Sequence, residues 1–213
     1  FGLRCLETCL NLSEIDVVGV VTAPQKFSIS YRLSGVINVL HADVYAVARS
    51  RNMPIQSLTQ SMSDTDLFAS VSKWNPDALL VVGWCHMIPK RWRELAPAYG
   101  LHASLLPDYS GGSPSVWAMI NGESETGITL FKMDRGVDSG PIVGQKSEPI
   151  WNDDMIDTLY ERIELRGIEL IEWYLPLLAF GSVKMKPQDE SKRRVMPQRG
   201  PEGGLINWNE KAA

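Results

Sequence analysis

Two apolar runs constrain the fold of this chain more than any other feature of its sequence. Residues 15–21 (IDVVGVV) and 78–84 (ALLVVGW) are both of strand length and almost continuously apolar. Because polar residues do not alternate along them, these runs predict strands that are buried on both faces, as in a parallel sheet. Helical patterns lie beside and between the runs. The sequence therefore predicts an α/β fold, with helices on both faces of an open, mostly parallel sheet.

The remaining apolar pattern predicts four helices and two shorter strands. The helices are expected near residues 3–11, 39–51, 64–73 (with Ser63 as the N-cap) and 154–179. In the last of these, Pro176 is expected to disturb the final turn and Gly181 to end the helix. The strands are expected at 128–133 and 142–145, on either side of the loop 134–141.

Composition excludes several functional classes. The chain has 213 residues, with 21 Lys and Arg against 25 Asp and Glu, which gives a net charge of −4. That charge provides no overall attraction for nucleic acid or anionic lipid, and no apolar run reaches the roughly 18–20 residues that a membrane span needs. The three cysteines, an odd number without paired spacing, predict reduced thiols in a cytoplasmic protein.

The loop 100–112 is the strongest candidate for chemistry, because open parallel sheets bind ligands beyond the carboxyl ends of their strands. It contains His102, one of only three histidines, among small residues. A histidine facing the core explains this residue equally well on the sequence alone. Ser104 and the distant Asp138 also suggest a Ser-His-Asp triad. However, no strand-G-x-S-x-G-helix elbow surrounds the serine, so an acyl-enzyme mechanism is not supported.

Metal and nucleotide sites have no support in the sequence. The three histidines, His41, His86 and His102, lack the close spacing of metal ligands, and neither C-x-x-C nor H-E-x-x-H occurs. No G-x-G-x-x-G follows a strand and no Walker loop is present. We therefore expect no metal, dinucleotide or nucleoside triphosphate cofactor.

Five short motifs occur in order between residues 102 and 142. They are HASLLP at 102–107, NGE at 121–123, TGIT at 126–129, MD at 133–134 and GVDSGPI at 136–142. This set resembles the folate-dependent formyltransferase family, which includes glycinamide ribonucleotide transformylase, methionyl-tRNA formyltransferase and the sugar N-formyltransferases. The pair H-x-S-L-L-P and D-x-G-x-D-x-G carries most of the specificity. The resemblance implies a Rossmann-like sheet.

A weaker resemblance reaches both ends of the chain. Residues 1–6 resemble the first helix of the family, and residues 187–191 and 204–208 resemble the segment that leaves its catalytic domain. The family's opening strand would precede Phe1, so we expect a first strand to be missing from this sequence. We also expect a catalytic domain over residues 1–185 and a C-terminal extension over 186–213.

The resemblance implies 10-formyltetrahydrofolate as the formyl donor, an amine as the acceptor, and no metal. His102 and Asp138 occupy the positions of the family's catalytic histidine and aspartate. An imidazole, which titrates near neutral pH, suits the removal of a proton from the attacking amine. A neighbouring aspartate would orient the ring and stabilise the imidazolium. The alternative role for Asp138 is a turn cap between glycines.

The resemblance also assigns residues to folate binding. The segment after the strand at 78–84 would bind the pterin, and the loop 134–137 would close over it from the other side. An apolar strand end that packs into the core explains Trp84 as well. The predicted cofactor-binding residues are Trp84, His86, Met87, Ile88, Asp134, Gly136 and Val137.

One position departs from the family pattern. Two residues before the catalytic histidine the family usually has an asparagine, whose amide helps to bind the developing oxyanion, but this chain has Gly100. Losing such a donor costs about 10²–10³-fold in rate where it is the main stabiliser. Three explanations stay open: protonated His102 acts with water, another side chain substitutes, or the protein is a slow or altered family member.

A small acceptor fits the sequence better than tRNA does, because phosphate contacts dominate nucleic-acid binding. The loop 25–35 has only two basic residues, and only residues 209–213 follow Trp208. The family's purine enzyme lacks the exit segment. We therefore expect a nucleotide-linked amino sugar as partner, and a homodimer by resemblance.

A methionyl-tRNA formyltransferase domain and a catalytically silent folate-binding protein are the alternative functions. The predicted acceptor-binding residues are Lys26, Tyr31, Arg32, Ser104 and Tyr109.

Overall fold

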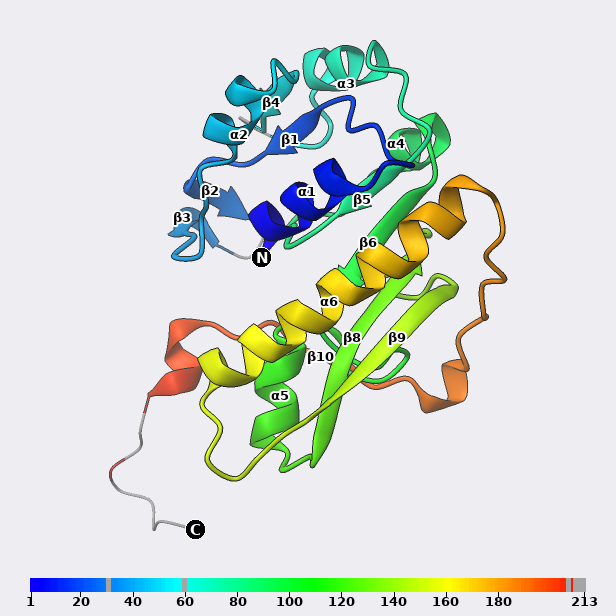
Figure 1. The fold of residues 1–213 in the computed structure, drawn as a ribbon. Coiled ribbons are helices and arrows are strands. Elements are labelled where there is room, and N and C mark those ends of the chain that lie inside the picture. Colours follow the sequence, from blue (N-terminus) through cyan, green and yellow to red (C-terminus); the bar gives the residue numbers. More distant parts are fainter. Residues whose placement is uncertain (30–31, 59–60, 206–207, 209–213) are drawn as a thin grey trace.

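The computed structural model describes residues 1–29, 32–58, 61–205 and 208, and its centre is a four-stranded sheet (Figure 1). The strand order is β5 (Leu79–Val81), β6 (Ala98–His102), β8 (Glu125–Lys132) and β9 (Ile142–Pro149). β5 and β6 are parallel, whereas β6 with β8 and β8 with β9 are antiparallel. The α/β class is therefore confirmed, in a sheet that combines parallel and antiparallel pairs.

Three pairs of short strands complete the described sheet structure. β1 (Val20–Thr22) runs parallel to β4 (Ile55–Ser57), and β2 (Lys26–Ile29) forms an antiparallel hairpin with β3 (Arg32–Ile37). Far along the chain, β10 (Val195–Met196) pairs in parallel with β7 (Ser110–Gly111). This last pair connects the C-terminal segment to the loop that follows His102.

Helices cover both sides of the central sheet (Figure 1). The long helix α6 (Ile156–Ala179) packs against β8 and β9, and α1 (Gly2–Asn11) packs against α6. The helices are α1 (Gly2–Asn11), α2 (Val44–Ser50), α3 (Thr65–Ser72), α4 (Lys90–Leu95), α5 (Pro114–Ile120) and α6 (Ile156–Ala179), with short 3₁₀ turns at Glu190–Lys192 and Pro201–Gly204. No helix in the described part of the chain is long and apolar enough to cross a membrane.

Two predicted helix starts are wrong, and in both cases an aspartate sets the true start. The carboxylate of Asp64 accepts hydrogen bonds from the backbone N–H groups of Asp66 and Leu67, so Asp64 rather than Ser63 is the N-cap of α3. Asp43 caps α2 in the same way, and the helix begins at Val44 instead of residue 39. A side-chain oxygen that satisfies the free N–H groups of the first turn fixes where a helix starts.

The strand predictions are correct in place but wrong in extent. The runs 15–21 and 78–84 yield only β1 at 20–22 and β5 at 79–81, because a strand extends only where a neighbour provides a hydrogen-bonded ladder. β6 was not predicted, and it absorbs residues 100–102 of the expected loop. The last helix runs through Pro176 and ends at Ala179, and Gly181 follows in a left-handed conformation with φ of 64°.

The core lies on both faces of β6, because successive side chains of a strand point to opposite faces. Ala98 packs in a buried cluster with side chains of α3 and α4, including Val71 and Trp92. Its neighbour Tyr99 packs in another cluster with Leu159 and other residues of α6. β6 is thus packed on both faces, which fixes the position of the strand that ends at His102.

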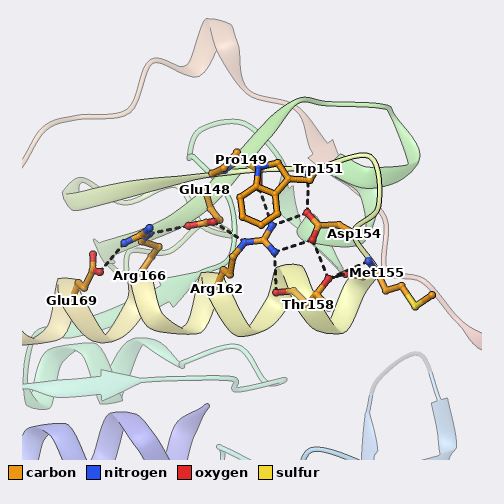
Figure 2. A network of polar contacts seen from close by, with 9 residues as sticks. All are labelled: Glu148, Pro149, Trp151, Asp154, Met155, Thr158, Arg162, Arg166 and Glu169. Atoms are coloured by element: carbon orange, nitrogen blue, oxygen red, sulfur yellow. Dashed lines mark hydrogen bonds and ion pairs between the residues drawn. The ribbon is translucent and has the colours of Figure 1, made fainter.

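A charged network fastens α6 to β9 (Figure 2). Glu148 of β9 is only 2% exposed, and its two carboxylate oxygens accept hydrogen bonds from Arg162 and Arg166, each at 2.8 Å. Arg162 also binds Asp154 and lies 4.0 Å from the centre of the Trp151 ring. A carboxyl group this buried loses its contact with water, and the two arginines offset that cost.

Candidate active site

His102 and Asp138 lie side by side, although 36 positions separate them in the sequence. His102 is the last residue of β6, and Asp138 lies in the connection between β8 and β9. The Nδ1 atom of His102 is 3.6 Å from Oδ2 of Asp138, and the two side chains are 11% and 17% exposed. The structure therefore brings the two predicted catalytic residues together in a largely buried position.

Backbone groups hold each member of this pair. The Nε2 atom of His102 is 2.8 Å from the carbonyl oxygen of Tyr109, and Oδ2 of Asp138 accepts a hydrogen bond of 2.9 Å from the N–H of Gly111. Since a carbonyl oxygen only accepts, Nε2 must carry a hydrogen. In a neutral ring, Nδ1 is then the free basic atom, and it faces Asp138.

This geometry suits the transfer of one proton. A proton added to Nδ1 of His102 creates an imidazolium whose two N–H groups face two acceptors, the carboxylate of Asp138 and the carbonyl of Tyr109. Tyr109 and Asp138 both have left-handed backbone conformations, with φ of 52° and 50°. Such conformations are costly for residues other than glycine and persist only where the surroundings enforce them.

The loop that carries Asp138 is ordered by a second aspartate. Oδ1 of Asp134 accepts hydrogen bonds from the N–H of Gly136 at 2.9 Å and from the hydroxyl of Ser139 at 2.7 Å. A Cβ atom at Gly136 would lie 2.1 Å from the Ser139 hydroxyl, so a larger residue there would displace this hydroxyl from Asp134. Val137 is 45% exposed at the loop surface. The predicted folate residues Asp134, Gly136 and Val137 thus share one loop with Asp138.

The other predicted folate segment contains two buried ring nitrogens without partners. Within the described residues, Nε1 of Trp84 and Nε2 of His86 are buried and make no hydrogen bond. Burial lowers the pKa of His86 below its ordinary value, which favours the neutral ring. Met87 is exposed, whereas Ile88 belongs to the core. Because unpaired buried polar atoms are costly, these nitrogens suit a heterocyclic ligand with its own donors and acceptors, as a pterin has.

The predicted acceptor residues are not all brought to one surface. Lys26 is exposed on β2, and its neighbour Phe27 lies 5.8 Å from the ring of His86, so this hairpin borders the segment 84–88. Arg32 begins β3, and Tyr31 lies outside the described residues. The last two predicted residues, Ser104 and Tyr109, are buried, at 0% and 5% exposed.

Both of these buried side chains have internal partners. The Ser104 hydroxyl donates to the carbonyl of Asp108 at 2.7 Å, and the Tyr109 hydroxyl donates to Glu123 at 2.5 Å. Burial, together with this bond to Glu123, raises the pKa of Tyr109 above its ordinary value, so the hydroxyl stays protonated. Ser104 and Tyr109 are therefore placed to order the loop, and the part of Tyr109 that reaches His102 is its carbonyl.

The described residues contain no group of three or more His, Cys, Asp or Glu side chains that could hold a metal ion.

Gly100 lies beneath an aromatic ring. It pairs with Phe131 across the β6–β8 ladder, and a Cβ atom added to it would be 3.0 Å from Cε1 of Phe131 and 3.5 Å from Cε of Met133. Phe131, which is itself only 2% exposed, thus limits the space for a side chain at position 100. The Phe131 ring occupies the space next to Gly100 that a larger side chain would need.

We expect Gly100→Asn to preserve or raise the rate of formyl transfer, because it places an amide donor two residues before His102. We also expect it to destabilise the protein by about 1–2 kcal/mol, because Phe131 must shift to admit the new side chain. Gly100→Ala is the matched control, since it has the steric cost without the amide. Rate assays and thermal melts of both variants measure the two effects. Complete loss of activity in a folded Gly100→Asn protein would contradict this expectation.

Several groups at the site left no signal in the sequence. The Tyr109 carbonyl and the Gly111 N–H are backbone groups, which nearly all residue types share (only proline lacks the N–H). Gln188 reaches the site from the C-terminal segment, where its side chain donates to the carbonyl of Asp138. The segment 187–191 carried a family resemblance, but no motif pointed to contact with Asp138.

Comparison with known proteins identifies related sequences. The family model described as "Formyl transferase" matches residues 5–172. The methionyl-tRNA formyltransferase of Geobacter metallireducens is 32% identical over 199 residues, which are 92% of this chain and 62% of that protein. The chain thus spans a little under two thirds of the length of this relative.

Solved structures share the fold. A sugar N-formyltransferase from Shewanella sp FDAARGOS_354 aligns with a TM-score of 0.69 at 16% identity, covering 100% of this chain and 76% of that one. WlaRD, a sugar 3N-formyl transferase whose structure was determined in the presence of dTDP and 5-N-formyl-THF, aligns with a TM-score of 0.68 at 20% identity, covering 99% and 69%. At these identities the likeness concerns the fold alone.

Proposed function

Because this chain belongs to the formyl transferase family, we propose that it transfers a formyl group from 10-formyltetrahydrofolate to an amine. The observation that carries the proposal is the pair formed by His102 and Asp138, whose facing atoms are 3.6 Å apart in a mostly buried position. Nε2 of His102 is engaged with a carbonyl, so Nδ1 is the atom available for proton transfer.

The proposed mechanism balances one proton. A new bond forms between the acceptor nitrogen and the formyl carbon, and the bond between that carbon and the folate nitrogen breaks. Nδ1 of His102 accepts the proton that the acceptor nitrogen releases. Asp138 stabilises the resulting imidazolium, and His102 then returns the proton to the leaving nitrogen, directly or through water. The folate supplies the formyl group.

We propose that the folate lies between two segments of the chain. One is 84–88, where the free ring nitrogens of Trp84 and His86 are suited to hydrogen bonds with a pterin. The other is the loop 134–137, which Asp134 holds in a tight turn next to Asp138. This arrangement would place the donor beside the proton-transferring pair and keep water from it.

Two acceptors are candidates, and each has its own support. We propose a nucleotide-linked amino sugar first, because the chain has a net charge of −4 and only two basic residues in the loop 25–35. Methionyl-tRNA is the second candidate, because related proteins that are about 30% identical are methionyl-tRNA formyltransferases. The homodimer, the cytoplasmic location and the division at residue 185 stay predictions.

An acceptor screen tests the proposal. Purified protein is incubated with 10-formyltetrahydrofolate and, separately, with nucleotide-linked amino sugars and with methionyl-tRNA, and products are analysed by mass spectrometry. We expect a formylated amino sugar and a matching release of tetrahydrofolate. Formylation of methionyl-tRNA alone would replace the first candidate with the second. Folate binding without any product across these acceptors would favour the silent folate-binding protein and contradict the proposed activity.

A further inference from the structure

Residues 186–196, which we term the crossing segment, pass along both halves of the proposed catalytic pair. The segment begins at a β-bridge between Lys186 and Ile142, next to the loop that carries Asp138. It ends in β10, which pairs with β7 immediately after Tyr109. In Figure 1 the chain leaves the end of α6, descends beside β9 and returns toward β10 and α5. One short segment is therefore bonded to both loops of the site.

On the Asp138 side, the side chain of Gln188 binds the loop that carries Asp138. Nε2 of Gln188 donates hydrogen bonds to the carbonyl oxygens of Asp138 and Gly140, at 2.9 and 2.7 Å. The guanidinium of Arg193 donates to the carbonyl of Val137. Carbonyl groups on both sides of the left-handed Asp138 are thus fixed by side chains of the crossing segment, and these bonds help to enforce its backbone conformation.

On the His102 side, an arginine covers Tyr109. The guanidinium of Arg194 lies 4.4 Å from the centre of the Tyr109 ring and forms ion pairs with Asp108 and with Glu123. Glu123 in turn accepts the hydrogen bond of the Tyr109 hydroxyl. Tyr109 is therefore fixed by its ring and its hydroxyl, and its carbonyl is the group that holds Nε2 of His102.

Backbone hydrogen bonds also connect the crossing segment to the residues that follow Tyr109. The N–H of Ser110 donates to the carbonyl of Arg194, and the N–H of Gly112 donates to the carbonyl of Met196, both at 3.0 Å. Gly111 lies between these two bonds, and its own N–H is the donor to the Asp138 carboxylate. The crossing segment thus fixes the groups that orient His102 and the groups that orient Asp138.

We propose that Gln188 and Arg194 are positioning residues, which set the approach of His102 to Asp138 through the loops that carry Asp138 and Tyr109. This inference rests on the proposed function. A displacement of about 1 Å at reacting groups costs about 10²-fold in rate, and each of the two left-handed residues relaxes if its support is removed. Neither positioning residue needs to touch the substrates, so their loss lowers kcat and leaves the KM for folate largely unchanged.

The test compares one variant of each positioning residue with a control variant of a neighbour in the same segment. Gln188→Glu keeps the size of the side chain but sets a carboxylate against two carbonyl oxygens, and we expect kcat to fall by about 10–100-fold. Arg194→Lys keeps the charge but loses the stacking and the two-pronged ion pair, and we expect a decrease of the same kind. Lys192→Ala is the matched control. Its exposed ammonium forms a long ion pair of 3.9 Å with Asp189, so kcat should stay at the wild-type value.

A double-mutant cycle separates positioning from general damage. In an Asp138→Asn background, which already impairs the pair, Gln188→Glu should lower kcat much less than it does in the wild type. Equal fold-losses in the two backgrounds would overturn the proposal. If Gln188→Glu does not fold in thermal melts, Gln188→Met removes the donors without adding charge, and an unchanged kcat in that variant would overturn the proposal too.

The proposed function and the proposed positioning fail in different ways. If neither the wild type nor Lys192→Ala forms a product with any acceptor, the proposed function fails and the inference fails with it. If His102→Ala abolishes turnover while both Gln188→Glu and Arg194→Lys keep the wild-type kcat, only the positioning role fails.

Discussion

His102→Ala should lower the rate of formyl transfer by about 10²–10⁴-fold, because it removes the group that takes the proton from the attacking amine. Folate binding should change little, since the proposed pterin contacts come from the segment 84–88 and the loop 134–137. The measurement is a steady-state assay of product formation, together with a folate titration of the same variant. We also expect a folded protein, because the histidine ring forms one backbone hydrogen bond and one contact with Asp138.

The control for this experiment is His41→Ala, a second histidine that precedes α2 and lies outside the pair. That variant should keep the wild-type rate. Asp138→Asn should give an intermediate loss, because the amide keeps the shape of the carboxylate but cannot stabilise an imidazolium by charge. If His102→Ala retained the wild-type rate, the proton would have to leave by another route and the proposed mechanism would be wrong.

Glu148→Gln should lower the free energy of unfolding by about 3 kcal/mol, at the low end of the range for breaking a buried ion pair. The low end is expected because Arg162 and Arg166 are 20% and 39% exposed, so water can partly replace the lost carboxylate. For a domain of this size, that change lowers Tm by about 6–12 °C. Thermal and urea unfolding of the purified protein measure it.

Glu169→Gln is the matched control in the same network (Figure 2). Glu169 also forms ion pairs, with Arg166 and Lys146, but it is 37% exposed. Exposed pairs contribute about 0–1 kcal/mol, so its replacement should have little effect on unfolding. Equal destabilisation by the two variants would show that burial does not set the energy of the network.

The sequence was most informative where side-chain chemistry is concentrated. The motifs around His102 and Asp138 identified two residues that the fold brings together, because both the residue types and their order were distinctive. It was least informative where backbone atoms act. The Tyr109 carbonyl and the Gly111 N–H contact the pair directly, yet a prediction from residue types assigned Tyr109 to the acceptor.

The bounds of the helices and strands were likewise hard to predict, because they depend on backbone pairing. Apolar runs located β1 and β5 but overestimated their lengths, because hydrophobicity does not show where a neighbouring strand stops pairing. Ser63 and Asp64 are both good caps by type, and only the geometry of the turn shows that Asp64 caps α3. The contacts of Gln188 with the Asp138 loop join residues 50 positions apart, and no local pattern encodes such a contact.

The most direct test of the account is a crystal structure of the protein with 5-formyltetrahydrofolate, a stable analogue of the donor. The account predicts that the pterin lies between the segment 84–88 and the loop 134–137, with its polar atoms near the ring nitrogens of Trp84 and His86. It also predicts that the one-carbon end of the ligand faces Nδ1 of His102. A ligand bound away from the pair of His102 and Asp138 would contradict the account.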